Sequence, residues 1–191
     1  MSDADQGLVG ATELFRRHAR FVARFVVRYG VALEDVDDVV QEVFLVAHAH
    51  GGYRPGPAKP TSWLAEIAVR IASSHRRRLR ARAFARGDGE QIADARSDAP
   101  TPETRAIVDR DLAVLHEALQ SLAPPHRLAF ILFELEDEPC SSIAAATGVP
   151  VGTVHSRLHV ARKRLREALD SGRAGRTGGA TARAQEAPWT R

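Results

Sequence analysis

The chain has 191 residues, a formal net charge of +3 and a single cysteine, Cys140. This length allows one large domain or two small ones, and one cysteine excludes an internal disulfide framework and fits a reducing compartment. The first residues are polar and acidic, and no apolar run approaches roughly 18 residues, so we expect neither a signal peptide nor membrane insertion. These features predict a cytoplasmic protein.

Charge is distributed unevenly along the chain. Residues 1–85 carry a net charge of +4, residues 86–140 carry −7 and residues 141–191 carry +6. Two basic blocks on either side of an acidic block are typical of a protein that contacts nucleic acid at two places.

The first half of the chain predicts three helices. Residues 11–29 form an amphipathic pattern that ends at Gly30, and residues 34–50 form a second one with acidic residues in its first turn. The stretch GGYRPGPAKP at 51–60 predicts a loop, and a third helix follows from Thr61 or Ser62 to about Arg86. The expected inward residues are Leu14, Phe15, His18, Phe21, Val22 and Phe25 in the first helix and Val36, Val39, Val40, Val43 and Ala47 in the second.

The outward face of the second helix predicts a protein contact. Asp38, Gln41 and Leu45 share this face, with Glu42 and Phe44 on its flanks. An exposed apolar residue surrounded by acidic groups is typical of a docking patch. The alternative is a solvated helix with one stray leucine, because single exposed apolar residues are common.

The third helix combines cations with an aromatic residue. Its outward face carries Arg70, Ser73, Arg77 and Arg80, and Trp63 lies near its start. Cations that follow phosphates and an aromatic ring that stacks on a base are the means by which proteins bind single-stranded DNA. The alternatives are a solvated basic helix end and a tryptophan that belongs to the core.

The second half of the chain predicts a linker and a second helical domain. Residues 87–103 have low hydrophobicity and many turn formers, which favours a flexible linker. Residues 104–121 and 126–136 predict two helices separated by Pro124-Pro125. Residues 1–10 and 171–191 are expected to be disordered. The predicted inward residues are Leu112, Leu115, Leu119 and Leu122 in the first of these helices and Leu128, Ile131, Leu132 and Leu135 in the second.

Residues 141–166 predict a helix-turn-helix that reads DNA. Ser141 and Ser142 are N-cap residue types, Thr147-Gly148 can end the first helix, and Pro150 suits the start of the next one. Polar residues followed by cations suit a helix that contacts bases first and phosphates further on. The alternative is that this second helix is only an amphipathic surface helix. In both interpretations its inward stripe is Val154, Leu158, Ala161 and Leu165, and its outward face is His155, Ser156, His159, Lys163 and Arg166.

These segments together resemble a known family. DVDDVVQEVF, the Trp-Leu-x-x-Ile-Ala segment at 63–68, the Arg-rich helix end, LAPPHRLAFILFELE and VPVGTVHSRLHVARKRLREAL are similar to the extracytoplasmic-function sigma factors of bacterial RNA polymerase. The resemblance covers residues 11–86 and 110–169. It implies an all-α fold with two small domains, a sigma region 2-like domain at 11–86 and a helix-turn-helix sigma region 4-like domain at 104–170, joined by the linker at 87–103.

The resemblance also implies roles for particular residues. Asp38, Gln41, Glu42, Phe44 and Leu45 would dock on core polymerase, and the loop from Tyr53 to Ser62 would capture a base of the minus-ten element. The residues expected to hold the opened strand are Trp63, Arg70, Ser73, Ser74, Arg77 and Arg80. The residues expected to bind the minus-thirty-five element are Thr153, His155, Ser156, His159, Val160, Arg162, Lys163 and Arg166.

The resulting hypothesis is a sigma factor that directs promoter recognition, with core polymerase, double- and single-stranded promoter DNA and an anti-sigma factor as partners. The rival hypothesis is a stand-alone helix-turn-helix regulator in which residues 11–86 serve dimerisation or sensing. An enzyme is disfavoured because no nucleophile or phosphate-binding glycine motif is present, and no cofactor is expected. His155 and His159 have a metal-ligand spacing but no evident third ligand, so no metal site is predicted.

Overall fold

The structure, a computed structural model, describes residues 7–85 and 113–182, and its regular elements in these ranges are helices apart from one isolated β-bridge. The predicted all-helical fold with two domains is confirmed. The elements are α1 (Ala11–Tyr29), the 3₁₀ turn η2 (Leu33–Asp35), α2 (Val36–Ala49), α3 (Pro60–Ala85), a helix over residues 113–121, α5 (Pro124–Phe130), the π-helical turn η3 (Ile131–Leu135), α6 (Cys140–Thr147) and α7 (Val151–Ala182). The predicted linker at 87–103 and residue Leu112 lie outside the described residues.

Helices α1, α2 and α3 form the first domain and pack against one another. Aromatic rings spaced four residues apart run along α1: the ring centroids of Phe21 and Phe25 are 6.1 Å apart and those of Phe25 and Tyr29 are 5.8 Å apart. The five inward residues predicted for α2 are all buried. All three rings are buried, so the aromatic column of α1 is a main part of the core of this domain.

The second domain consists of the helix at 113–121, α5, α6 and α7. The predicted stripe of α7 is confirmed, because Val154, Leu158, Ala161 and Leu165 are each at most 4% exposed. Gly148 ends α6 with φ of 66°, and the Val149 N–H donates to the Ala144 carbonyl at 3.1 Å. This left-handed cap turns the chain sharply into α7 and completes the predicted helix-turn-helix.

Several boundaries differ from the predictions. Thr61 and Ser62 lie inside the first turn of α3, and Ser141 and Ser142 lie inside α6, whose N-cap is Pro139. The helix predicted at 126–136 begins at Pro124 and becomes the π-helical turn η3 after Phe130. Near the two ends of the chain, Val9 forms an antiparallel bridge with Tyr53, and α7 continues to Ala182. Residues 1–6 and 183–191 lie outside the described residues.

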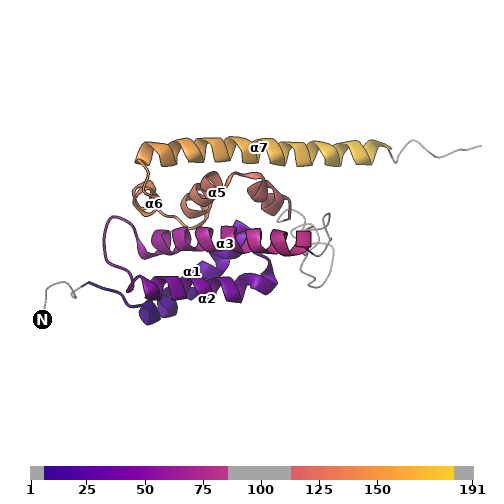
Figure 1. Ribbon diagram of the computed structural model, residues 1–191. Coiled ribbons are helices and arrows are strands. Elements are labelled where there is room, and N and C mark those ends of the chain that lie inside the picture. The colour runs from indigo at the N-terminus through magenta and orange to yellow at the C-terminus, as the bar shows by residue number, and fades with distance from the viewer. Residues whose placement is uncertain (1–6, 86–112, 183–191) are drawn as a thin grey trace, which may run out of the picture.

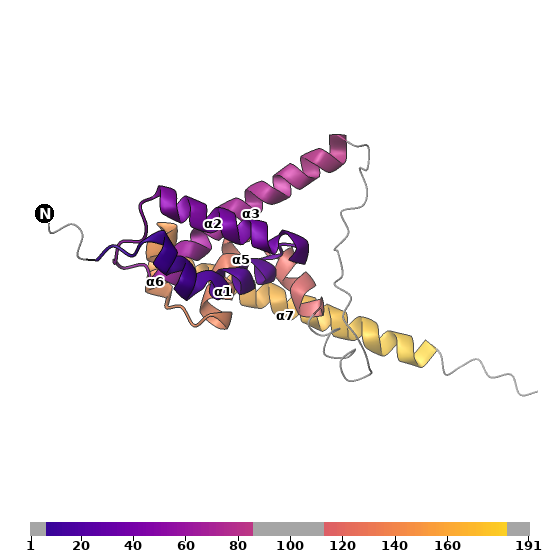
Figure 2. The same ribbon diagram turned by 90° about the horizontal axis from the view of Figure 1, so that it is seen from below.

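The helices form stacked layers (Figures 1 and 2). α1 and α2 form one side of the molecule, and α3 lies across them. α5 and α6 cover the other side of α3, and α7 lies on α5 and α6 at the side away from the first domain. The two domains are therefore in direct contact, and the outer surfaces of the stack belong to α2 and α7.

Gly30, at the end of α1, is required by both its backbone and its surroundings. Its φ is 103°, and a Cβ there would overlap Oε1 of Gln120 in the second domain. This amide oxygen accepts a hydrogen bond from the buried Arg127, so moving the Gln120 side chain aside would cost that bond. Positive φ strains any residue with a side chain by about 1–3 kcal/mol. Gly51 has a φ of 77°, but a Cβ added to it would meet nothing within 4 Å, so a substitution at Gly51 isolates the backbone strain.

We expect Gly30→Ala to lower the free energy of unfolding more than Gly51→Ala, because only Gly30→Ala adds a clash to the strain of about 1–3 kcal/mol. Urea unfolding followed by circular dichroism measures both values. Equal losses in the two variants would show that the contact between Gly30 and Gln120 does not constrain the fold.

Candidate nucleic-acid and protein-binding surfaces

The outward face of α7, the recognition face, is formed by five exposed residues: His155, Ser156, His159, Lys163 and Arg166. The Ser156 hydroxyl donates to the Gly152 carbonyl at 3.0 Å, so it is held against the helix at the N-terminal end of this face. Helix α7 lies on the side of α5 and α6 away from the first domain (Figure 1), so the first domain does not cover this face. It is open to a large ligand such as a DNA duplex, with the polar residues ahead of the cations.

Other predicted contacts on α7 are less available. The Arg162 guanidinium pairs with Glu134 at 2.6 Å and lies 5.6 Å from the centre of the Phe133 ring, so it is held on the second domain. Thr153 and Val160 are half-buried. His155 is exposed, although its Nδ1 lies 4.0 Å from the Cys140 sulfur. The N-terminal half of α7 is therefore braced against η3 and α6.

The outward side of α3 carries the cations predicted for single-stranded DNA. Arg70 is exposed and pairs with Glu66 at 2.6 Å, and Arg77 is exposed. Ser73 and Ser74 are half-buried, between the surface and the core. The side chain of Arg80 lies outside the described residues. Because Glu66 neutralises Arg70, Arg77 is the stronger candidate for a phosphate contact on this surface.

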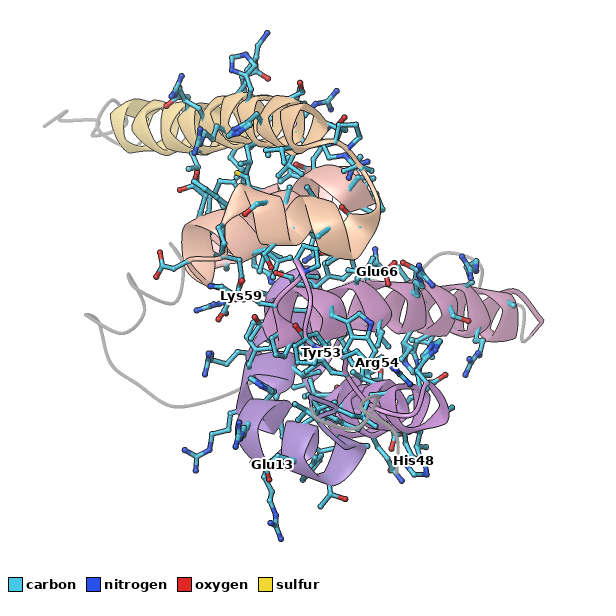
Figure 3. The ribbon with its side chains drawn as sticks, turned by 90° about the vertical axis from the view of Figure 1, so that its left-hand side faces the viewer. Glu13, His48, Tyr53, Arg54, Lys59 and Glu66 are labelled. Atoms are coloured by element: carbon cyan, nitrogen blue, oxygen red, sulfur yellow. The ribbon has the colours of Figure 1, made fainter. Side chains whose placement is uncertain are left out.

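Trp63 is half-buried and packs against two rings. Its ring centroid lies 5.7 Å from that of Tyr53 and 6.4 Å from that of His50. The Tyr53 hydroxyl donates to the Ala58 carbonyl at 2.5 Å, so the loop before α3 is fixed to this aromatic group. Figure 3 shows Tyr53 and Lys59 on the segment that leads into α3. Trp63 thus contributes to packing and still keeps part of its ring accessible.

The docking face of α2, formed by Asp38, Gln41 and Leu45, points to solvent as predicted, and Leu45 is 59% exposed. Glu42 lies beside it and pairs with Arg78 at 3.4 Å. Phe44, also predicted to dock, is only 7% exposed and meets the ring of Phe15 edge-on at 5.1 Å.

Phe15, which was predicted to point inward, is 50% exposed. Phe44 occupies the inward position between the two helices, so Phe15 covers Phe44 from outside instead of entering the core.

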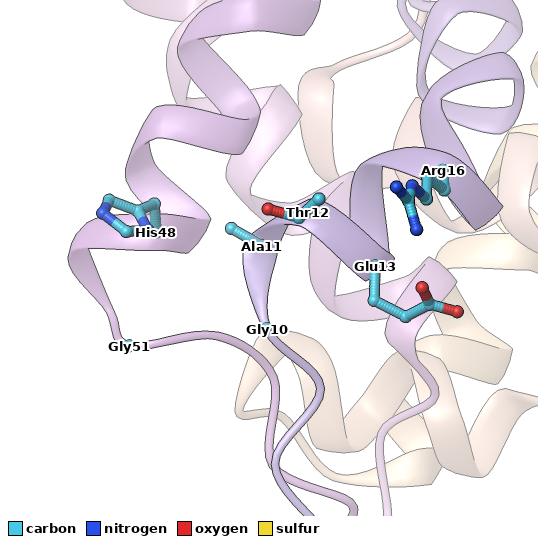
Figure 4. A pocket seen from close by; sticks show the side chains of 7 residues that line it. All are labelled: Gly10, Ala11, Thr12, Glu13, Arg16, His48 and Gly51. Atoms are coloured by element: carbon cyan, nitrogen blue, oxygen red, sulfur yellow. The ribbon is translucent and has the colours of Figure 1, made fainter.

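The structure also has a shallow hollow, shown in Figure 4. It lies between the start of α1 and the end of α2, and its lining includes Arg16 and His48. His48 follows Leu45 by three residues and so lies on the same side of α2. A partner bound to the docking face can extend into this hollow.

The contact between the domains contains a buried carboxylate that the sequence did not indicate. Glu138 is 6% exposed and accepts hydrogen bonds from the Thr61 hydroxyl at 2.5 Å and the Ser62 hydroxyl at 3.2 Å. The Lys59 ammonium lies 3.6 Å from the same carboxylate. A chain of hydrogen bonds extends from the Ser62 hydroxyl. The backbone N–H of Lys59 donates to the Ser142 hydroxyl, which in turn donates to the Ser62 hydroxyl, each at 2.8 Å.

Two further ionic groups hold α1 to the second domain. Glu136 pairs with Arg28 and, at 3.3 Å, with Arg24. Arg127 is 2% exposed and donates to the Tyr29 carbonyl at 2.8 Å and to the carbonyls of Gln120 and Leu122. Burial lowers the pKa of Arg127, but a guanidinium is so strong a base that it stays charged.

Burial also raises the pKa of Tyr29, whose neutral ring lies 5.2 Å from the Arg127 guanidinium. The sequence contains one sign of these contacts between the domains, the acidic run Glu134–Glu138 directly before the helix-turn-helix. No sequence pattern indicated which residues these acids would bind. A cluster of acids beside a basic domain is usually solvated, and only the tertiary structure shows which of them are buried.

Two negative observations concern residues 7–85 and 113–182. In these ranges no three His, Cys, Asp or Glu side chains gather into a group that could hold a metal ion. No helix there is long and apolar enough to cross a membrane.

The fold and these surfaces define a two-domain helical protein with a helix-turn-helix. Family models agree with this class: sigma-70 region 2 matches residues 14–82 and sigma-70 region 4 matches residues 112–165. The chain belongs to the extracytoplasmic-function subfamily of sigma-70 RNA polymerase sigma factors. It is a sigma factor that directs promoter recognition, and its family is non-enzymatic.

Individual proteins show the same similarity. Over 82% of its length the chain is 34% identical to CarQ of Myxococcus xanthus and 30% identical to the sigma-H factor of Pseudomonas aeruginosa, and it spans 87% and 84% of these proteins. It is 35% identical to SigE of Mycolicibacterium smegmatis, of which it spans 60%. Among solved structures it matches RpoE, in complex with the anti-sigma factor NepR from Bartonella quintana, with a TM-score of 0.63 and 25% identity over 83% of this chain and 96% of that one.

The assignment of the two sides of α2 can be tested by truncating neighbouring residues. Phe44→Ala should lower the free energy of unfolding by about 3–5 kcal/mol, because it leaves a cavity under Phe15. Leu45→Ala should change it by less than about 0.5 kcal/mol, because Leu45 is mostly in water. Chemical unfolding of both variants measures these values, and a large loss in Leu45→Ala would show that Leu45 belongs to the core.

Proposed function

We propose that three surfaces divide the work of this sigma factor. The docking face of α2 binds core RNA polymerase, α3 holds the opened promoter strand, and the recognition face of α7 binds duplex DNA. The observation that carries this proposal is their separation, since the exposed acidic and apolar face lies on α2 while the cations predicted to bind DNA are exposed on α3 and α7.

The docking face suits a protein better than DNA. Asp38 would repel a phosphate backbone, whereas Leu45 loses its contact with water when a partner covers it. Gln41 between them supplies polar contacts at the edge of the apolar spot. The hollow beside His48 enlarges this surface, and its lining carries both an acid, Glu13, and a cation, Arg16. Glu42 contributes by pairing with Arg78, and Phe44 contributes by supporting the helix from inside.

The opened minus-ten strand is held by α3 and by the loop before it. Arg77 contacts a phosphate, and Arg70 joins it once the DNA competes with Glu66. Ser73 and Ser74 offer hydroxyls between the cations, and Arg80 is the further cation that the sequence predicts for this contact. Trp63 presents the accessible part of its ring to an unstacked base, a contact that contributes about 1–3 kcal/mol per base. Strand opening needs no nucleotide hydrolysis, because binding the unstacked strand offsets the cost of melting.

The minus-thirty-five element is bound in the major groove by α7. His155, Ser156 and His159 lie near the helix N-terminus, which enters the groove first, with Thr153 and Val160 at its margins. Lys163 and Arg166 lie further along and bind phosphates, and Arg162 adds to them after exchanging Glu134 for DNA. The protein acts in the cytoplasm, where its polymerase and promoters are found. An anti-sigma factor is a further partner, because the structurally similar RpoE was captured with one.

Simultaneous replacement of Asp38, Gln41 and Leu45 by Ala should weaken binding to core polymerase by at least about tenfold, because truncated central contacts commonly cost 1–2 kcal/mol or more. The melting temperature should stay nearly constant, since all three side chains are exposed. Gel filtration with core polymerase and promoter-directed transcription in vitro measure binding and function. If the wild-type chain neither binds core polymerase nor directs transcription, the proposed function is wrong.

The recognition face gives a prediction that separates base contacts from phosphate contacts. Ser156→Ala and His159→Ala should change which promoters are preferred, with a loss of about 1–3 kcal/mol for a base contact. Lys163→Ala should weaken all promoters alike and lower the salt slope of binding by about one unit. Holoenzyme affinities on promoters with altered minus-thirty-five sequences, at several salt concentrations, distinguish the two. An unchanged promoter ranking in the Ser156 and His159 variants would contradict their role.

A further inference from the structure

We propose that the buried thiol of Cys140 sets the direction in which His155 forms hydrogen bonds, so that this histidine reads promoter bases only as a donor. The inference rests on the proposed function of α7 as the helix that binds the minus-thirty-five element, and it deepens that function. It makes Cys140 a positioning residue for base recognition, which acts through His155 without touching the DNA itself.

Cys140 lies where it can hold the start of α7. It is the first residue of α6 and is 9% exposed. The left-handed cap at Gly148 turns the chain, so that the start of α7 packs against α6 (Figure 1). The Cys140 sulfur therefore comes within 4.0 Å of Nδ1 of His155, which is within reach of a hydrogen bond that involves the large sulfur atom.

This contact leaves one ring nitrogen of His155 for DNA. The two nitrogens of an imidazole point to different sides of the ring, and His155 is exposed although its Nδ1 faces the buried sulfur. Nε2 is therefore the nitrogen that can meet a base edge. Whether Nε2 donates or accepts is decided by the hydrogen bond that Nδ1 makes.

The surroundings of the thiol make it the donor in this pair. Cys140 stands in the first turn of α6, where the neighbouring backbone groups are N–H donors without partners in the helix. These groups can donate to the sulfur, but they cannot accept its hydrogen. The buried S–H therefore has Nδ1 of His155 as its acceptor, and burial without an acceptor would cost free energy.

Donation by the thiol makes Nε2 a donor as well. A neutral imidazole has one N–H and one acceptor nitrogen, so when Nδ1 of His155 accepts, the ring hydrogen is on Nε2. If the thiol proton passes to Nδ1, giving a thiolate and an imidazolium, both ring nitrogens carry hydrogen. In either arrangement His155 donates to a base and does not accept from one.

A fixed donor predicts which base edges His155 can read. In the major groove guanine offers N7 and O6, adenine offers N7 and thymine offers O4 as acceptors, whereas cytosine presents its N4 amino group, which is a donor. The wild type should therefore disfavour cytosine at the position that faces His155. His159 lies four residues further along the same face, and the chain has no second cysteine that could orient it in the same way.

Nuclear magnetic resonance of the full chain with ¹⁵N-labelled histidine tests the contact without polymerase or DNA. Cys140→Ala should move the Nδ1 signal of His155, which is identified by its loss in His155→Gln, and should leave the signals of His159 unchanged. Cys140→Ser is the matched variant, because it has nearly the volume of alanine but keeps a donor, so its His155 signal should lie closer to that of the wild type. Identical His155 signals in the wild type and Cys140→Ala would overturn the positioning role, whether or not the protein acts as a sigma factor.

A double-mutant cycle on promoter affinity tests whether the contact affects base reading. Holoenzyme affinity is measured on promoters that carry each base in turn along the minus-thirty-five element. Cys140→Ala should reduce the discrimination against cytosine at one position by about two- to tenfold, the effect of a single hydrogen bond. In a His155→Ala background the same substitution should change nothing further. Losses of equal size in both backgrounds, or unchanged discrimination in Cys140→Ala, would overturn the inference while leaving the sigma-factor function intact.

Discussion

A buried charge must find hydrogen-bond partners, and two buried charges determine where the two domains of this protein meet. Arg127 lies in the Pro-Pro-His-Arg segment, and its guanidinium binds the carbonyls of Gln120 and Leu122 in its own domain and that of Tyr29 in the other. Glu138 makes the reciprocal contact with the start of α3. Removing one partner from such a group leaves an uncompensated buried charge, which is strongly destabilising. The pairing of α1 and α3 with the second domain follows from this requirement.

The same requirement explains which surfaces remain open. The side of the second domain that contacts the first is formed by α5, η3 and α6, so α7 is left on the outside with its recognition face in solvent. On the first domain the second covers parts of α1 and α3, which leaves the docking face of α2 exposed. The docking face of α2 and the recognition face of α7 are therefore both exposed, while the start of α3 is occupied by Glu138.

This arrangement has a consequence for how such a factor is used. A partner that binds the docking face of α2 does not compete with the contact between the domains, because Asp38, Gln41 and Leu45 take no part in that contact.

The sequence predicted features that depend on residues close together in the chain better than features that depend on distant residues. The stripe of α7, the inward valines of α2 and the left-handed Gly148 cap were all predictable, because helical periodicity and glycine conformation are local properties. Phe15 and Phe44 were harder, because both fit an apolar face and only the neighbouring helix decides which of them is covered. The last part of α7, residues 171–182, was not predicted to be helical, because its glycines favour irregular structure.

The sequence by itself determined the helical class, the two basic regions, the helix-turn-helix and the family. Each of these follows from residues close together in the chain. Only the tertiary structure decided that Glu138 binds Thr61 and Ser62 and that Arg127 binds the end of α1, since these partners are separated by more than 70 residues. An acidic or basic side chain has the same appearance in a sequence whether it is solvated or buried. Its partners depend on how whole domains pack, so the contacts between the domains could be found only in three dimensions.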